Sequence, residues 1–216
     1  MKEGISIIIR NKNEAKSLSK LLKILTTEYK KDIDEIIVVD NMSTDNSKEV
    51  INFYKCKYVC IKNFTYGRGI NVGVENCSYN YCVLLSSHVI PVGNHFFKNI
   101  NLYFKKHNDA AGLRFCRSKF DVENYYNREA ITYDLNKHGL LASGSVFKKN
   151  VWNDIKFDET LFAAEDKDWS KKVLALGYKI YTIPSVYFYI NTRNWKQEAN
   201  KYKIEKIAHF QIFKTN

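Results

Sequence analysis

The sequence has few of the residues that mark turn-rich β proteins, disulfide scaffolds and membrane spans. Two Pro and nine Gly among 216 residues argue against an all-β protein. The five Cys form no CxxC pair, so buried thiols in a reduced, cytoplasmic protein are favoured over disulfides or a zinc site. No stretch reaches the roughly 20 apolar residues of a membrane span, and the first residues show no secretion signal.

Positive charge is what the chain has in excess. There are 34 Lys and Arg against 23 Asp and Glu, a net charge of +11. Such a surface attracts nucleic acid, anionic lipid or phosphorylated small molecules, and a Lys-rich solvated surface explains it equally well. No motif typical of RNA or DNA recognition is present, so we expect no nucleic-acid partner. Apolar residues make up 45%, which is enough for a folded α/β domain.

Strand-like and helix-like segments alternate along the chain, which predicts βαβ units and a mainly parallel sheet flanked by helices. Residues 118–138 are polar and weakly periodic and are interpreted as a loop. We expect one domain over residues 1–190 and an amphipathic tail over 191–216 that packs on it, with a basic membrane-surface helix as the alternative. Strands are predicted at 5–9, 36–39, 58–61, 81–85, 110–115, 140–147 and 179–183, and helices at 13–29, 43–54, 67–76, 96–104 and 162–176.

A carboxylate ends one of the predicted buried strands. Asp40 directly follows the apolar run 36–39. Ligands of open α/β sheets bind outside the carboxyl ends of the strands, where a fixed carboxylate accepts hydrogen bonds from a base or a ribose. Asp40 is therefore predicted to contact a nucleotide. The alternative is a helix N-cap, but Ser43 and Thr44 are already placed for that role.

Four segments, taken in order, resemble the family 2 glycosyltransferases. Ser-Ile-Ile-Ile-Arg-Asn-Lys-Asn-Glu (6–14) resembles the family's opening strand, and Ile-Ile-Val-Val-Asp-Asn-Met-Ser-Thr-Asp (36–45) its second strand. Gly-Arg-Gly-Ile-Asn-Val-Gly (67–73) resembles a later helical segment. Phe-Asp-Glu-Thr-Leu-Phe-Ala-Ala-Glu-Asp-Lys-Asp-Trp (157–169) resembles the acceptor-side motif with its acidic pair. The resemblance implies the GT-A fold, a nucleotide-sugar donor and inversion at the anomeric carbon.

The resemblance also assigns roles to residues. Asp166 is expected to be the general base, because a sugar hydroxyl is a poor nucleophile until its proton is removed. Glu165 is the alternate base or a clamp for the acceptor hydroxyl. Both carboxylates could instead only answer a helix dipole. The donor is expected to contact Arg10, Asn11, Glu14, Asp40, Ser43, Arg68, Asn71, Ser86 and Ser87.

One motif departs from the family pattern. The family carries Asp-x-Asp after its fourth strand to bind a divalent metal, Mn or Mg, whereas this chain reads Ser86-Ser87-His88. Rhamnosyltransferase-like relatives have a similar Ser-Ala-His-x-x-Pro pattern, so the change resembles a subfamily trait. His88 is predicted to face the donor diphosphate or a metal. An imidazole suits Mn better than Mg, which prefers oxygen, and an ordinary loop histidine is the alternative.

The function predicted on these grounds is sugar transfer from a nucleotide-sugar to a glycan or lipid-linked glycan in bacterial surface polysaccharide synthesis, with a peripheral membrane location as the alternative to a purely cytoplasmic one. A nucleotidyltransferase would need a Gly-rich loop after the first strand, and residues 10–14 contain no Gly. A non-catalytic nucleotide- or glycan-binding module is the remaining alternative, and the presence of Asp40 and the acidic pair argues against it.

Overall fold

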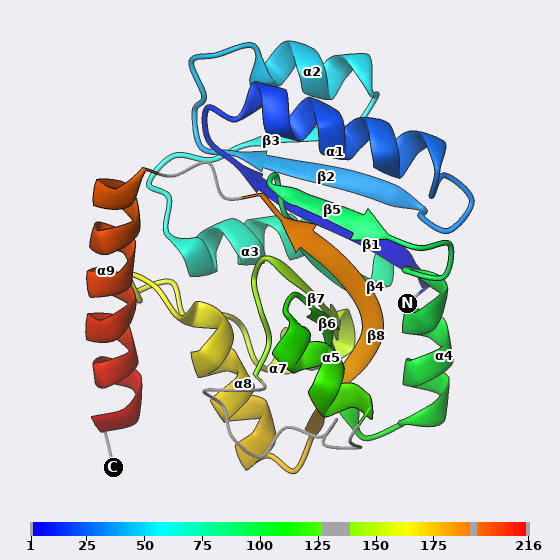
Figure 1. The fold of residues 1–216 in the computed structure, drawn as a ribbon, viewed down its shortest axis with the longest axis vertical. Coiled ribbons are helices and arrows are strands. Elements are labelled where there is room, and N and C mark those ends of the chain that lie inside the picture. The colour runs from blue at the N-terminus through cyan, green and yellow to red at the C-terminus, as the bar shows by residue number, and fades with distance from the viewer. Residues whose placement is uncertain (1, 127–138, 191–193, 215–216) are drawn as a thin grey trace.

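The computed structural model describes residues 2–126, 139–190 and 194–214, and in that part of the chain eight strands form one mixed sheet (Figure 1). Their order is β3-β2-β1-β4-β7-β6-β8-β5. Pairing is parallel from β3 to β4 and between β6 and β8, whereas β7 and β5 run antiparallel to their neighbours. The strands are Lys2–Asn11 (β1), Glu35–Asp40 (β2), Lys57–Cys60 (β3), Tyr79–Ser86 (β4), Val89–Val92 (β5), Ala110–Cys116 (β6), Gly144–Lys148 (β7) and Lys179–Tyr189 (β8).

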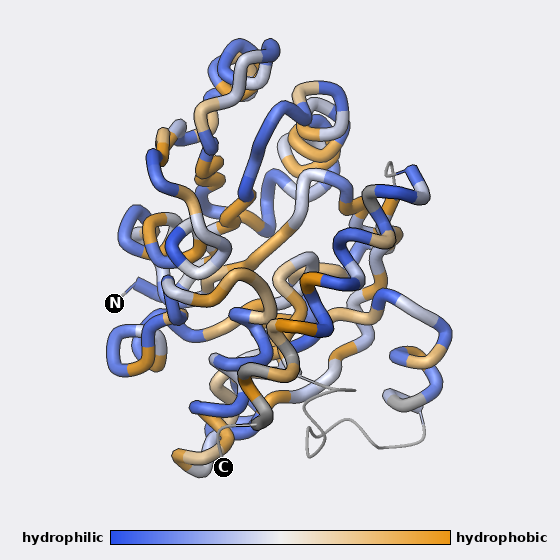
Figure 2. Tube along the Cα trace, turned by 90° about the vertical axis from the view of Figure 1, so that its left-hand side faces the viewer, coloured by the Kyte–Doolittle hydropathy of each residue, from blue (hydrophilic) through white to orange (hydrophobic). Residues whose placement is uncertain are grey.

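Helices cover both faces of the sheet, so the central strands bury side chains on both sides. In β1, Ile7 and Ile9 pack into the core beneath α1, α2 and α4, while Ile8 packs into the core beneath α3, α7 and α8. Figure 2 shows the apolar stretches running through the middle of the molecule. The helices are Ala15–Thr27 (α1), Ser47–Phe53 (α2), Tyr66–Glu75 (α3), Lys98–Lys106 (α4), Lys119–Tyr126 (α5), Lys149–Asp154 (α7), Glu165–Ala175 (α8) and Trp195–Lys214 (α9).

The periodic patterns of the sequence explain the two helices beside β1. The leucines of α1 recur at helical spacing, and Leu18, Leu21, Leu22 and Leu25 are all buried. Burying each contributes about 1.5–3 kcal/mol relative to exposure. On the other face, α3 lies close to β1 because Gly73 faces Ile8, where a Cβ would collide with the isoleucine side chain. The α/β class expected from the sequence is confirmed by this fold.

The last predicted strand is longer than the sequence suggested. We expected it to end at Pro184, but β8 continues to Tyr189. The pairing with β6 shifts after Ile183, so that Cys116 lies opposite Val186 and the two intervening residues form a bulge. Proline has no N–H to donate and is tolerated at such a bulge. The extension carries Tyr187 and Tyr189 alongside β5.

Other boundaries also differ from the sequence-based expectations. Helix α2 begins at Ser47 rather than residue 43. Part of the expected loop 118–138 forms α5, because Asp121 and Ser118 bond each other's backbone and side chains at its start, while residues 127–138 lie outside the described residues. Neither β5 nor α7 was predicted. Among the described residues, none of the helices is both long and apolar enough to cross a bilayer.

Candidate functional site

The candidate site lies at one edge of the sheet. The carboxyl ends of β1, β2 and β4 meet there because these strands are parallel neighbours. Strand β6 runs in the same direction, since the antiparallel β7 joins it to β4. The polar segments 10–14, 40–45 and 86–88 follow three of these strand ends. The N-terminus of α8 reaches the same edge, where Glu165 contacts Arg10.

Asn11, Asp40 and Ser43 form a buried cluster, which we call the Asp40 cluster. Asp40 is 1% exposed. Its Oδ1 accepts hydrogen bonds from Asn11 Nδ2 at 2.8 Å and Ser43 Oγ at 2.6 Å, and its Oδ2 accepts one from the Ser43 amide at 2.8 Å. Ser43 therefore serves Asp40 rather than capping α2, the role that the sequence suggested. Asp40 fixes the shape of the loop. Both of its carboxylate oxygens are hydrogen-bonded inside the protein.

The Asp40 cluster nevertheless keeps one unused acceptor. The Oδ1 atom of Asn11 is buried and makes no hydrogen bond with any described residue. A buried polar atom without a partner is rare in folded proteins and calls for an explanation such as a bound ligand. An amide oxygen at the end of a central strand can accept a hydrogen bond from an N–H or O–H donor.

Hydrogen bonds between the loops that follow β1 and β2 hold these loops against each other. Lys12 Nζ donates to the carbonyl oxygens of Asn41 at 2.6 Å and Met42 at 2.9 Å. Asn13 Oδ1 accepts from the Thr44 amide at 2.7 Å. Asn13 and Met42 have φ values of 52° and 49°, in the left-handed region that disfavours Met. These bonds offset the local strain, which is typical of binding loops.

Glu165 is tied to the first strand by Arg10. Arg10 Nη1 lies 2.8 Å from Glu165 Oε1 and 3.1 Å from the Tyr66 carbonyl, and its guanidinium carbon lies 5.1 Å from the centre of the Tyr66 ring. Glu165 is 4% exposed. Burial raises the pKa of the Glu165 carboxyl and the nearby Asp166 adds to the rise, although Arg10 opposes it. Glu165 therefore positions Arg10 and is poorly placed to meet an acceptor.

Asp166 stands in a more open environment than its neighbour. It is half-buried, and its Oδ2 accepts from the Ala142 amide at 2.9 Å while its Oδ1 accepts from the Lys167 amide at 2.8 Å. Each carboxylate oxygen can accept more than one hydrogen bond, so lone pairs remain for a substrate hydroxyl. Ala164, just before α8, has φ 63°, and the two carboxylates that follow it contact different partners, Arg10 for Glu165 and backbone amides for Asp166. The two carboxylates are thus not equivalent.

His88 lies beside Glu14. Its Nε2 is 3.5 Å from Glu14 Oε1, and its ring centre is 5.9 Å from that of Tyr189 at the end of β8. A divalent metal would need several oxygen or nitrogen ligands that converge on one point. In the described part of the chain, no group of three His, Cys, Asp or Glu side chains is arranged in this way. The side chains present therefore do not fit a resident metal, although a diphosphate could add ligands to this pair.

The two donor-site candidates on α3 face the acceptor-side loop. Arg68 Nη1 lies 3.7 Å from Glu159 Oε2, and both side chains are nearly half exposed. Asn71 is buried, with Nδ2 donating to the Phe157 carbonyl and to Glu159 Oε1, each at 2.9 Å. Asn71 Oδ1 accepts from the Trp152 indole and the Phe157 amide. The amide group of Asn71 is therefore fully used inside the protein, and Asn71 positions the loop.

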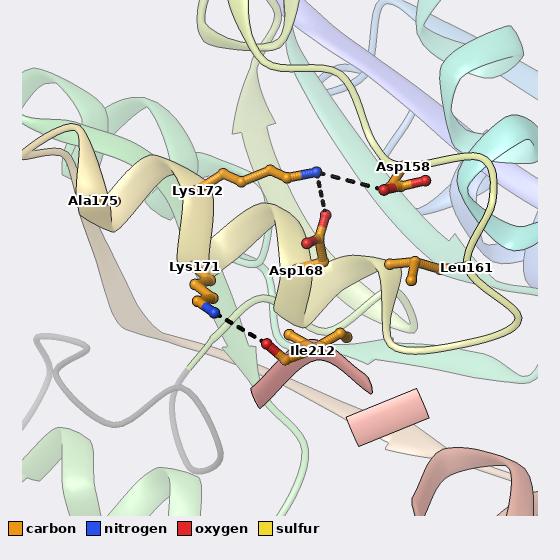
Figure 3. A pocket seen from close by; sticks show the side chains of 7 residues that line it. All are labelled: Asp158, Leu161, Asp168, Lys171, Lys172, Ala175 and Ile212. Carbon is orange, nitrogen blue, oxygen red and sulfur yellow. Dashed lines mark hydrogen bonds and ion pairs between the residues drawn. The ribbon is translucent and has the colours of Figure 1, made fainter. Parts of the chain in front are cut away.

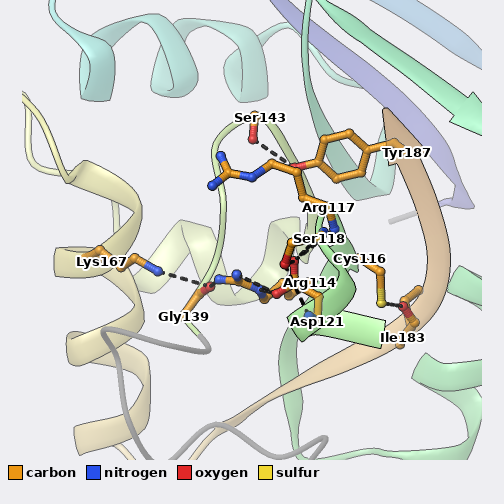
Figure 4. A network of polar contacts seen from close by, with 10 residues as sticks. All are labelled: Arg114, Cys116, Arg117, Ser118, Asp121, Gly139, Ser143, Lys167, Ile183 and Tyr187. Atoms are coloured by element: carbon orange, nitrogen blue, oxygen red, sulfur yellow. Dashed lines mark hydrogen bonds and ion pairs between the residues drawn. The ribbon is translucent and has the colours of Figure 1, made fainter. Parts of the chain in front are cut away.

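Further polar residues at this edge were missed by the sequence analysis. Figure 4 shows Arg117 beside Tyr187 and Ser143, with Lys167 on the facing helix. Burial lowers the pKa of Lys167 to about 8, partly offset by Asp166. Ser86 and Ser87 lie nearby, since the Ser86 amide donates to the Ser143 carbonyl at 3.2 Å. The signals available were Arg117, two residues after the predicted strand 110–115, and Lys167, directly after the acidic pair.

Comparisons with known proteins find glycosyltransferases among the sequences similar to this chain. An uncharacterized glycosyltransferase of Methanocaldococcus jannaschii is 23% identical over 98% of this chain and 79% of its own length. A dolichyl N-acetyl-α-D-glucosaminyl phosphate 3-β-D-2,3-diacetamido-2,3-dideoxy-β-D-glucuronosyltransferase of Methanococcus voltae is 24% identical over 88% of this chain and 67% of its own length.

Solved structures share the fold at low identity. A Pyrobaculum calidifontis mannosyltransferase, solved with GDP-mannose and Mn²⁺, superposes with a TM-score of 0.77 at 15% identity over 98% of this chain. The chain spans 64% of that protein's length. TarS of S. aureus, solved with UDP-GlcNAc, gives 0.69 at 17% identity over 98% of this chain and 67% of its own. Residues 6–173 match glycosyl transferase family 2. The chain is therefore a member of glycosyl transferase family 2.

Proposed function

We propose that the chain moves a sugar from a nucleotide diphosphate to a hydroxyl of a glycan or lipid-linked glycan, with inversion at the anomeric carbon. One observation carries the proposal. Arg10, next to Asn11 of the Asp40 cluster, forms a hydrogen-bonded ion pair with Glu165, next to Asp166. The candidate nucleotide-binding edge and the candidate base are thereby held at a fixed separation, as an in-line displacement requires.

The side chains supply the steps of that reaction. Asp166 takes the proton from the attacking hydroxyl, whose oxygen forms the new bond to the anomeric carbon. The bond from that carbon to the diphosphate oxygen breaks on the opposite face, and the diphosphate leaves with the electron pair. Arg68 and His88 are the candidates to stabilise its charge. Arg10 acts through its contact with Glu165. Ser86 and Ser87 border the same path.

The nucleotide assignment is tested by binding. We expect UDP, GDP or dTDP to bind in calorimetry, and Asp40→Ala to weaken that binding about tenfold or more, because Asn11 and Ser43 lose the carboxylate that orients them. Asp154→Ala, an exposed acid on α7, is the matched control. Unchanged affinity in Asp40→Ala with an intact fold would contradict the assignment.

A screen of nucleotide-sugars for donor hydrolysis and transfer tests the activity itself. It is run with and without EDTA, so that a requirement for a metal bound together with the donor diphosphate would be detected. Hydrolysis of one donor in the panel supports the proposal. Nucleotide binding without hydrolysis or transfer of any sugar would favour the non-catalytic binding module instead.

The biological role is proposed from the relatives. The Methanococcus voltae relative is named for transfer to a dolichyl-linked sugar phosphate, which supports a lipid-linked acceptor here. The curated relatives above are archaeal, so they lend nothing to the bacterial surface polysaccharide that we expected. The Ser-x-His motif and its rhamnosyltransferase-like subset likewise stay predictions from the sequence. Assembly of a surface glycan is the role that we retain.

A lipid-linked acceptor makes the outer face of α9 relevant. Ala208 and Ile212 are buried, and the Ile212 carbonyl accepts a hydrogen bond from Lys171 of α8 at 3.0 Å (Figure 3). The opposite side is apolar and basic. Trp195, Tyr202, Ile207 and Phe210 are 76%, 60%, 51% and 57% exposed, and Lys196 and Lys206 lie over the Trp195 and Tyr202 rings. Aromatic and basic side chains on one helix suit an anionic membrane surface.

We therefore expect the protein to co-sediment with phosphatidylglycerol vesicles and less with phosphatidylcholine vesicles. The double variant Trp195→Ser with Phe210→Ser should bind about tenfold less, because each ring contributes up to a few kcal/mol of buried apolar surface. Leu102→Ser is the control, since Leu102 of α4 is 61% exposed elsewhere. Equal binding of wild type and double variant would show that α9 serves only to pack on the domain.

A further inference from the structure

A second polar cluster is built at the end of β6, beside the candidate site. Arg114 is buried, and its Nε and Nη2 donate to Asp121 Oδ1 at 3.2 and 2.8 Å. Asp121 Oδ2 accepts from the amides of Arg117 and Ser118, both at 3.0 Å. Arg114 Nη1 also donates to the Gly139 carbonyl at 2.8 Å. The backbone that carries Arg117 is therefore fixed by a buried ion pair.

The Arg117 side chain is not used by this scaffold. It is exposed, and its guanidinium makes no hydrogen bond or ion pair with another described residue. Figure 4 shows it extended from the end of β6, past the Tyr187 ring and below Ser143. The Tyr187 hydroxyl is 2.9 Å from Ser143 Oγ, and burial raises the pKa of Tyr187 to about 12, so that it stays neutral. Tyr187 positions the Ser143 hydroxyl at the side of Arg117.

The surroundings of Arg117 carry an excess of positive charge. Arg114, Arg117 and Lys167 are the cations, and Asp121 and Asp166 are the anions. Asp121 is matched by Arg114 at 2.8 Å. Lys167, which is half-buried, donates to the Gly139 carbonyl at 3.4 Å, and its pKa responds to the charges of both arginines and of Asp166. One guanidinium is left over, at the surface and facing open solvent.

The position of Arg117 separates it from the donor side. The Asp40 cluster lies at the ends of β1 and β2, whereas Arg117 follows β6, three strand spacings or about 14 Å from β1 in the sheet order. The loop 139–143 precedes β7, which lies between β4 and β6 in the sheet. Its Ala142 amide bonds Asp166, and its Ser143 lies beside Arg117 in Figure 4. Arg117 and the Asp40 cluster therefore lie at the ends of different strands, with β4 and β7 between them in the sheet order.

We propose that Arg117 and the Ser143 hydroxyl form a subsite for an oxyanion, a phosphate or a carboxylate, that the acceptor carries close to its attacking hydroxyl. The inference rests on the proposed function, since it presumes that Asp166 faces the acceptor. Arginine presents a planar fork of N–H donors that matches such a group bidentately. The fixed backbone at Arg117 means that little ordering is needed when the anion binds.

The test uses the full chain and two probes. UDP, GDP and dTDP are titrated alone, and inorganic phosphate is then titrated by amide NMR into protein saturated with the nucleotide that binds, and also into nucleotide-free protein. Arg117→Gln should weaken phosphate binding about tenfold or more, the usual effect of losing a charged hydrogen-bond partner. Arg117→Lys should lose less. Lys119→Gln, whose side chain is 88% exposed two residues away, should bind phosphate as the wild type does.

The outcomes separate the two sources of an oxyanion. Nucleotide affinity within about twofold of wild type in every variant, together with the phosphate loss in Arg117→Gln, supports the subsite. A loss of nucleotide affinity in Arg117→Gln would assign Arg117 to the donor diphosphate and overturn the proposal. Equal phosphate binding by wild type and Arg117→Gln would also overturn it. Failure of every nucleotide to bind the wild type would instead contradict the proposed function. The phosphate titration of nucleotide-free protein would then still decide whether Arg117 binds an anion.

Discussion

Replacing Asp166 with Asn should lower sugar transfer by roughly 100-fold or more while leaving nucleotide binding nearly unchanged. The Asn side chain keeps the shape of Asp but takes no proton at neutral pH. Asp166 is the more exposed member of the acidic pair, and its carboxylate accepts hydrogen bonds from two backbone amides. Glu165→Gln should act differently, because it releases Arg10 and disturbs the loop at β1. The assay is transfer to an acceptor, since water can replace the acceptor in donor hydrolysis.

Two controls make that result interpretable. Asp168→Asn, on the same helix and paired with Lys172 at 2.7 Å, should keep near-normal transfer. The amide group that Asp166→Asn introduces would face a backbone N–H of Ala142 or Lys167, so urea unfolding is measured beside activity to separate loss of the base from loss of the fold. If Asp166→Asn transfers normally and Glu165→Gln does not, the base is Glu165. If neither variant matters, the transfer reaction itself is in doubt.

The sequence predicted the elements whose signal is local. Continuous apolar runs such as 36–39 become buried strands, and the leucines of α1 become its buried face. It did not predict elements whose cause is tertiary. Strand β5 is four residues long and exists because β8 pairs with it, and β8 passes Pro184 because a bulge absorbs the missing N–H. Helix α5 depends on Asp121, whose partner Arg114 lies on β6.

The sequence predicted which residues belong to the candidate site better than it predicted how they contact one another. Motif order brought Asn11, Asp40 and Ser43 forward as a group, and the fold places them in contact. Spacing alone could not show that both oxygens of Asp40 accept hydrogen bonds from neighbouring residues. It also could not show that the amide group of Asn71 is hydrogen-bonded to the loop at Phe157. It also could not place Arg117 near Asp166, because that proximity is created by the strand order across β7 and β6.

The largest stability effect is expected from Asp121→Asn. Arg114 is 6% exposed and Asp121 2%, so the substitution leaves a buried guanidinium without its counter-charge. Breaking such a pair from one side costs about 3–5 kcal/mol of unfolding free energy. Asn also presents an amide to donors that need an acceptor, since Ser118 and the Arg117 amide both donate to Asp121. Urea unfolding should show the loss as a lower midpoint with an unchanged slope.

The same pair gives the variant a pH signature. Burial raises the pKa of Asp121, but Arg114 and the hydrogen bonds from Ser118 and the Arg117 amide outweigh it and lower the pKa below its ordinary value. A carboxyl with a lowered pKa stabilises the fold above its unfolded-state pKa of about 4, and that contribution is lost as pH falls through the lower folded-state value. Asp121→Asn should therefore lose least stability, relative to wild type, at the most acidic pH. Glu123→Gln on the same helix breaks only an exposed pair with Lys119 and should cost less than about 1 kcal/mol at any pH. Similar losses in both variants would mean that Arg114 is hydrated and that the β6 turn, with Arg117 on it, is not rigidly held.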